Sequence, residues 1–328
     1  MMLDMRTKAW SPELCKLIDW DLATLPPIVE PSQHVGNVSR RGAEESGLPE
    51  GLPVIAGTMD TAVETFGAGS VNPGNGTIKL ATAGTVSVVS DECVAHDSVI
   101  DYPHVVPVRS FAITGTNSCA SAHRWLRDLL NASHDTTPSN NVFEELDAKA
   151  ALVSAGSNGM LFHPYLNGER SPYWDAKLRA DFLGVTMQHT RGHFVRALYE
   201  GVAFSLWDCN LCLEAEGLKM ETVRLIGGGS KSATWSQIVC DVFGKPVEIP
   251  VNGDASFGAA LLAGVGVGLF ADEHEAVAKS VRVARRFDPD PARTQTYRDM
   301  FGIYKESQVL LSDINHRLSD FSSRQNEG

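Results

Sequence analysis

Asp60 is the side chain whose sequence context best suits a general base. It follows the short apolar run Pro53–Ala56, which is typical of a buried strand, and Gly57 ends that run before a helix of small residues. A carboxylate at a strand end can take a proton from a bound hydroxyl group. The same position also suits an Asp that only caps the helix, and taken alone this structural interpretation is the stronger one.

A turn of small residues lies a short distance downstream. Two β-rich runs, Thr77–Leu80 and Thr85–Val89, flank a turn that contains Thr82 and Gly84. Backbone N–H groups in such a turn can approach phosphate oxygens because no large side chain intervenes. Thr82 and Thr85 are also ordinary strand residues. The turn therefore indicates a phosphate site only when other motifs in the chain support it.

A second glycine turn, with the sequence GGGSKS, covers Gly227–Ser232. It follows a strand predicted over Thr222–Ile226 and precedes a helix predicted over Ala233–Phe243. The N-terminus of a helix offers free N–H groups and a positive dipole end to an anion. The spacing matches neither a Walker A loop nor a G-x-G-x-x-G fingerprint. The turn alone favours a ligand site and a tight structural connection about equally.

The elements that must position these turns alternate between strand and helix. The strongest helical pattern covers Thr190–Gly217, where apolar residues recur every three or four positions. A strand is predicted over Pro246–Pro250, and a helix rich in Gly and Ala over Ser256–Gly266. This alternation predicts an α/β layered domain.

The loop Leu166–Asp175 is dense in charged and aromatic residues. In one interpretation it is a surface loop held by a salt bridge of Glu169 or Arg170. In the other, a buried ion pair in this loop shapes a cleft. The structural role is favoured here.

Composition narrows the class of protein and its partners. The 328 residues are 43% hydrophobic and 21% charged, as in soluble globular proteins, and the net charge of -12 argues against nucleic acid as a partner. The N-terminus has no signal-peptide pattern, and the apolar run Phe257–Ala271 is too short to span a membrane. The six cysteines lack zinc-site spacing. We expect a cytoplasmic protein with reduced cysteines, no membrane contact and no protein-bound metal.

Five segments together resemble the FGGY family of carbohydrate kinases, and within it the xylulokinase branch. They are Ile55–Thr61, Leu80–Thr85, His163–Trp174, Arg196–Phe204 and Gly227–Ser232, and the resemblance extends from residue 1 to about residue 270. It implies an actin-like, ribonuclease H-like α/β fold, represented mainly by its C-terminal domain. It also implies that MgATP and a sugar or polyol bind between two domains.

The resemblance implies roles for individual residues. Asp60 falls on the catalytic base, and ATP and Mg²⁺ are the implied cofactors. The implied nucleotide-binding residues are Thr82, Gly84, Thr85, Ala120, Arg124, Gly228, Gly229, Ser230 and Ala233.

The sequence also departs from the family pattern. The Asp-x-Gly-Thr phosphate motif of the family's N-terminal domain does not occur, and Ala81 and Ala180 stand where glycine is usual. We therefore expect most of the N-terminal domain to be missing. Residues 1–69 are assigned to the last segment of that domain, 70–318 to the C-terminal nucleotide-binding domain, and 319–328 to a polar tail.

Three functions remain open at this point. The first is ATP-dependent, xylulokinase-like phosphorylation of a sugar hydroxyl, incomplete in this chain. The second is a non-catalytic nucleotide-binding or interaction module left by truncation. The third, another ATPase of the actin-like superfold, is disfavoured by the loop around Glu169 and Arg170. The expected protein partner is a second copy or the missing domain, and the sequence does not identify the sugar.

Overall fold

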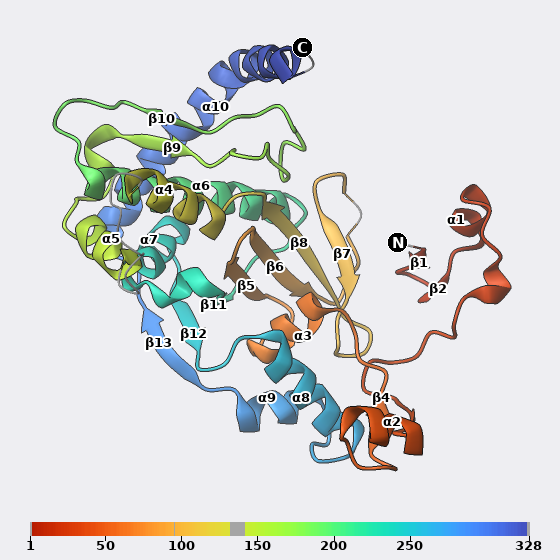
Figure 1. Cartoon of the computed structure of the whole chain (residues 1–328). Helices are drawn as coiled ribbons and strands as arrows, with labels where there is room; N and C mark the ends of the chain where they lie inside the picture. The colour runs from red at the N-terminus through yellow and green to blue at the C-terminus, as the bar shows by residue number, and fades with distance from the viewer. Residues whose placement is uncertain (1, 95, 132–141, 327–328) are drawn as a thin grey trace.

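The computed structural model describes residues 2–94, 96–131 and 142–326. Its centre is a mixed seven-stranded sheet in the order β13-β12-β11-β5-β6-β8-β7 (Figure 1). In this sheet β11 runs parallel to β5 and β12, while the other neighbours are antiparallel. The strands are β5 (Asn75–Leu80), β6 (Gly84–Ser90), β7 (Ile100–Pro103), β8 (Ser110–Thr116), β11 (Thr222–Ile226), β12 (Val247–Pro250) and β13 (Val283–Phe287).

Helices cover both faces of this sheet, as Figure 1 shows. One face packs against α6 (Arg191–Ala215), whose buried residues share a core with those of neighbouring helices. The other face packs against α3 (Asp60–Gly67) and α8 (Ala255–Gly266), which form a second core with β8 residues such as Phe111. All seven residues of β8 are buried, which agrees with its position between two apolar layers. The predicted α/β layered domain is confirmed.

The helices around α6 follow the sequence pattern closely. They are α4 (Ala120–Asn131), α5 (Val142–Ala151) and α7 (Ala233–Phe243), and α7 has the bounds predicted for it. Its N-cap, Ser232, accepts a hydrogen bond from the Trp235 backbone N–H. α6 begins after Thr190, whose backbone N–H donates to Nδ1 of His193 at 3.1 Å.

The N-terminal part contains only short elements. These are β1 (Leu3–Asp4), β2 (Ala9–Trp10), α1 (Pro12–Leu17), the 3-10 turn η1 (Leu22–Thr24), β3 (His34–Asn37), α2 (Arg40–Ser46) and β4 (Pro53–Ile55). The strand predicted before Asp60 exists as β4, but it pairs with β3 rather than joining the central sheet. Figure 1 shows β1, β2 and α1 apart from the sheet and its helices.

The chain after residue 266 holds elements that the sequence analysis did not assign. They are α9 (Glu273–Ser280), β13 and the long helix α10 (Pro291–Asn326), which includes most of the segment expected as a polar tail. Upstream, η2 (Ser157–Gly159) precedes β9 (Leu161–His163), which pairs with β10 (Asp181–Leu183). Neither α6 nor α10, the long helices in the described ranges, has an apolar stretch able to cross a membrane.

Candidate active site

Asp60 is the first residue of α3. The residue at the N-cap is Met59, and it makes no side-chain capping bond, so Asp60 does not occupy the capping position considered above. Its Oδ1 accepts hydrogen bonds from the Thr61 backbone N–H at 2.7 Å and the Thr61 hydroxyl at 3.3 Å. Among the described residues, Oδ2 has no hydrogen-bond partner. One exposed carboxylate oxygen is therefore available to a ligand.

Asp60 lies at a cavity of about 270 Å³. Polar groups on its wall come from Thr61, Thr85 at the start of β6, and Arg170. Aromatic side chains of Tyr102 and Trp174 line it as well. The cavity thus combines a carboxylate, hydroxyls and a cation with apolar surface, a composition typical of a small-molecule site.

Among the described residues, neither Glu169 nor Arg170 forms the ion pair considered in either sequence interpretation. Glu169 is buried and accepts hydrogen bonds from the Thr116 hydroxyl, the Ser205 hydroxyl and the backbone N–H groups of Asn117 and Arg170. Burial raises the pKa of Glu169, and these hydrogen bonds act against that rise. The Arg170 side chain instead lines the Asp60 cavity, which the sequence analysis did not predict.

The turn between β5 and β6 is held by the beginning of α4. The Ala81 carbonyl accepts from Ala120 N–H at 2.7 Å, and the Thr82 carbonyl accepts from Cys119 N–H and the Ser121 hydroxyl. The Thr82 hydroxyl accepts from Nη2 of Arg124 at 3.1 Å. Within the described chain, the N–H groups of Thr82 and Ala83 donate to no protein acceptor. The turn is fixed while two of its donors remain available.

The two glycine turns meet at the end of β5. Gly227 has a φ of 88°, and a Cβ there would lie 2.6 Å from the Leu80 carbonyl oxygen. A Cβ on Gly229 would lie 2.7 Å from the Leu80 Cβ. Only glycine permits this close approach. Segments more than 140 positions apart are thereby brought into contact through Leu80.

A second cavity, of about 450 Å³, opens beside this contact. Four residues predicted from the resemblance line it together: Ala120, Arg124, Gly228 and Gly229. The remaining predicted residues lie differently. Thr85 lines the Asp60 cavity, the Ser230 hydroxyl donates to the Gly227 carbonyl at 2.7 Å, and Gly84 is buried against Leu206 and Thr116. Ala233 begins α7 and is exposed.

The second cavity has an aromatic wall that the sequence analysis missed. Tyr199 and Trp235 stack with ring centroids 4.5 Å apart, and His123 packs edge-on against both rings. Burial lowers the pKa of His123 to about 4, so the imidazole is neutral near pH 7. Asp147 stands at the same cavity and accepts from the hydroxyls of Ser232 and Thr234.

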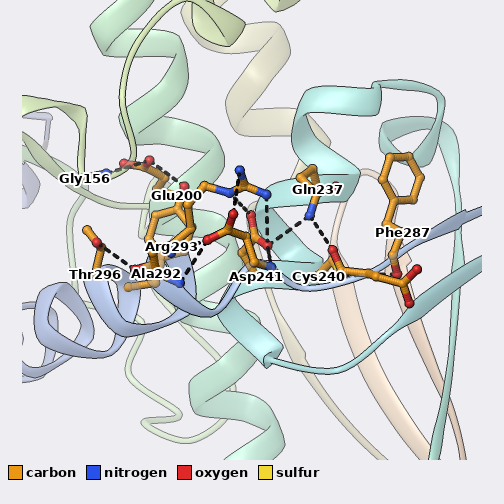
Figure 2. Close-up of polar contacts among 12 residues, drawn as sticks. Gly156, Glu200, Gln237, Cys240, Asp241, Phe287, Ala292, Arg293 and Thr296 are labelled. Atoms are coloured by element: carbon orange, nitrogen blue, oxygen red, sulfur yellow. Dashed lines mark hydrogen bonds and ion pairs between the residues drawn. The ribbon is translucent and has the colours of Figure 1, made fainter.

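A polar network fixes the helices behind this cavity (Figure 2). On α7, Asp241 is 1% exposed and accepts from Nε of Arg293 at 2.5 Å and Nε2 of Gln237 at 2.9 Å. On α6, buried Glu200 accepts from the Gly156 N–H at 3.0 Å and the Tyr297 hydroxyl at 2.9 Å. Because Arg293 and Tyr297 both belong to α10, that helix holds α6 and α7 in place.

The side chains offer no preformed metal cage. Among residues 2–94, 96–131 and 142–326, no group of three or more His, Cys, Asp or Glu side chains could hold an ion. All six cysteines are free.

Comparison with known proteins gives two family matches. Residues 77–267 match the C-terminal domain of the FGGY family of carbohydrate kinases, and residues 1–67 match its N-terminal domain. The chain therefore contains part of the N-terminal domain's sequence pattern, and the expectation that this domain is missing is too strong.

Individual relatives agree with these matches. Xylulose kinase of Staphylococcus epidermidis is 33% identical over 88% of this chain and 58% of its own length. Gluconokinase of Bacillus subtilis is 27% identical over 98% of this chain and 63% of its own length. The crystal structure of xylulose kinase from Rhodospirillum rubrum superposes with a TM-score of 0.86 at 28% identity, covering 96% of this chain and 63% of that one. The chain thus spans less than two thirds of the relatives' length.

Proposed function

The chain belongs to the FGGY family of carbohydrate kinases, and on this premise we propose that it transfers the γ-phosphoryl group of ATP to a hydroxyl group of a sugar or polyol. The observation that carries the proposal is the meeting of the two glycine turns at Leu80. The β5–β6 hairpin contributes Thr85 to the Asp60 cavity, while its Thr82 bonds to Arg124 of the second cavity. One hairpin therefore links the two cavities.

The second cavity is proposed to hold the adenosine part of ATP. Its volume of about 450 Å³ suits a ligand of that size, and the aromatic wall offers apolar surface to a purine. The 3-10 turn at Gly228 and the N–H groups of Thr82 and Ala83 are candidate donors to the phosphates. Gly84, Ser230 and Ala233 are proposed to act by shaping these turns, since their side-chain positions face protein or solvent.

Asp60 is the proposed general base. A carboxylate within hydrogen-bond reach of an alcohol can take its proton as the new P–O bond forms. The rest of phosphoryl transfer depends on positioning and on neutralising the phosphate charge. Because Thr61 engages only Oδ1, the second oxygen of Asp60 can accept the substrate proton.

Mg²⁺ fits this site only as an ion that arrives with the nucleotide. The described side chains form no cluster able to hold it alone, whereas ATP phosphates supply oxygen ligands of the kind it prefers. When bound, Mg²⁺ would supply neutralising charge on the phosphates. Asp60 is the carboxylate at the cavity that could contact it or one of its waters.

For the acceptor we propose a ketopentose of the xylulose type. The support is that the S. epidermidis relative and the R. rubrum structure are both named xylulose kinase. Residues 1–69 and 70–318 are proposed as parts of the two domains that enclose the acceptor, in a cytoplasmic enzyme that draws on cellular ATP.

Calorimetric titration of the chain with MgATP tests the nucleotide site first. We expect binding, followed by phosphorylation of xylulose in a panel that also contains ribulose, gluconate and glycerol. Binding without turnover of any acceptor would favour the non-catalytic nucleotide-binding module. If the folded chain does not bind MgATP, the proposed nucleotide site is wrong.

A further inference from the structure

We propose that Arg170 is a further catalytic residue, whose guanidinium contacts the phosphoryl group while it is transferred. The inference rests on the proposed kinase function and adds one residue to its machinery. Arg170 and Asp60 line the same cavity of about 270 Å³. In the described structure each side chain bonds to other groups, and no ion pair joins the two.

The protein makes room for this guanidinium at one position of β8. A Cβ on Gly115 would lie 3.0 Å from Nη2 of Arg170 and 2.8 Å from the Gly84 carbonyl oxygen. Any larger residue would push the arginine away from the hairpin that carries Thr82 and Thr85. The guanidinium therefore lies beside the start of β6, next to the turn proposed to hold the phosphates.

The cation has little to neutralise it in the described part of the chain. Its one hydrogen bond runs from Nη2 to the Thr116 carbonyl at 3.2 Å, and its buried Nε has no acceptor. The neighbouring Glu169 is already satisfied by other donors and meets Arg170 only through the backbone N–H. A buried donor without a partner costs free energy. The unpaired Nε of Arg170 therefore points to a ligand that accepts hydrogen bonds from this guanidinium.

A phosphoryl group in transit is the ligand whose chemistry fits best. Negative charge spreads over its three equatorial oxygens, and a planar guanidinium can donate to two of them in parallel. Fixed donors aimed at such charge stabilise the transition state more than the bound ground state.

The balanced step is the following. The acceptor hydroxyl oxygen forms a bond to the γ-phosphorus, and the bond between that phosphorus and the β–γ bridging oxygen breaks. The electron pair of the broken bond stays on ADP, and the hydroxyl proton moves to Asp60. Arg170 changes no bond of its own and only donates hydrogen bonds to the transferred oxygens.

Substitution separates this role from a structural one. We expect Arg170→Gln to lower kcat roughly 10²- to 10³-fold, the range seen when one transition-state donor is removed. The KM for the sugar and the affinity for MgATP should change less than about threefold. Arg170→Lys should recover part of the activity, and added guanidinium ion should partly restore Arg170→Ala. A raised KM for the sugar with kcat unchanged would overturn the proposal in favour of a sugar contact.

A binding measurement keeps the inference testable apart from turnover. Inorganic phosphate is titrated into wild type and Arg170→Gln, with the tryptophan fluorescence, to which Trp174 in the same cavity contributes, as the signal. Phosphate binding lost in the variant supports the proposal, while equal binding or none in wild type overturns it. Lys177 lies just after the loop of Arg170 and makes an exposed pair with Asp320, so Lys177→Gln is the matched control and should behave as wild type. An inactive wild type would contradict the proposed kinase function, yet the phosphate comparison would still decide the role of Arg170.

Discussion

At the scale of single residues, the contrast between Asp60 and Glu169 shows how environment decides what a carboxylate can do. Glu169 is buried and takes hydrogen bonds from four groups, so both its oxygens are committed to holding the loop. Asp60 is exposed at a cavity and commits one oxygen to Thr61. The first carboxylate is structural, whereas the second keeps one oxygen open to a ligand.

Asp60→Asn is therefore expected to lower kcat by about 10²- to 10⁴-fold, the usual contribution of a general base. The amide can still accept from Thr61, so the start of α3 should persist. Nucleotide affinity, measured by calorimetry, should remain close to that of wild type. If affinity falls as much as kcat does, Asp60 is not acting as a base.

The two glycines at the second cavity predict different outcomes on substitution. A Cβ at Gly229 meets Leu80 and the ring of Trp235, so a larger residue there would displace the turn itself. A Cβ added at Gly228 would have no heavy atom of another residue within 4 Å, and Gly228 lines the cavity. Gly228 is thus the position where an added side chain enters the cavity without first distorting the protein.

We expect Gly228→Val to weaken MgATP binding at least tenfold in calorimetry while the Tm stays within about 2 °C. The matched control is Gly36→Val on β3, where a Cβ also meets nothing within 4 Å, and Gly36 does not line either of the two cavities described here. Wild-type affinity in Gly228→Val would show that nucleotide does not fill this cavity.

At the scale of elements, α10 shows where sequence reasoning stopped too early. The helix was not assigned, although Tyr297 and Tyr304 are seven positions apart and both fully buried, with Met300 and Phe301 between them. This periodicity is visible in the sequence, but residues 291–318 were assigned to the C-terminal domain without a helix, and only 319–328 were interpreted as a polar tail. By contrast, α7 was predicted well because Ser232 and Gly244 mark both of its ends.

Arg293 of α10 gives this helix a measurable role. Its Nε donates to Asp241, which is almost fully buried on α7 (Figure 2). We expect Arg293→Ala to lower the free energy of unfolding by about 1–3 kcal/mol, because Asp241 keeps its bonds to Gln237 and the Asp290 N–H but loses a charged donor. Urea unfolding would measure this loss.

Arg317→Ala is the control for this prediction. Arg317 lies on the same helix and pairs at 3.9 Å with exposed Asp313, so its removal should change the free energy by less than about 0.5 kcal/mol. Equal effects of the two variants would mean that the network behind α7 does not stabilise the fold.

At the scale of the whole molecule, the sequence predicted the layers but not the order of the sheet. Strand and helix periods are local, so β5, β6 and β11 could be located from their own residues. The parallel pairing of β11 with β5 joins Thr222 to Asn75, and no local pattern carries that information. The same limit applies to the sites. Asp60, the glycine turns and Arg170 lie in family-like segments, but only tertiary packing brings Arg170, His123 and Trp235 to their cavities.

Two buried histidines on opposite faces of this sheet make the fold sensitive to acid. His104 packs edge-on against Phe111 and donates from Nε2 to the Ser70 carbonyl at 3.0 Å, while His123 lines the second cavity. Burial lowers the pKa of each to about 4. An unfolded histidine has a pKa near 6.5, so between those values the unfolded chain binds protons that the folded chain excludes.

The stability that these histidines contribute is therefore complete above about pH 6.5 and is lost as the pH falls toward 4. We expect the free energy of unfolding in urea to decrease by a few kcal/mol, to order of magnitude, between pH 7 and pH 4.5. His104→Asn should flatten this dependence even if it lowers stability at pH 7, because the variant has no proton to bind at that site. His34→Asn, on an exposed strand, should leave the slope as in wild type. If the free energy of unfolding of His104→Asn depends on pH as steeply as that of wild type, the acid sensitivity comes from other groups. If the wild-type free energy does not depend on pH, neither histidine is excluded from protonation in the folded state.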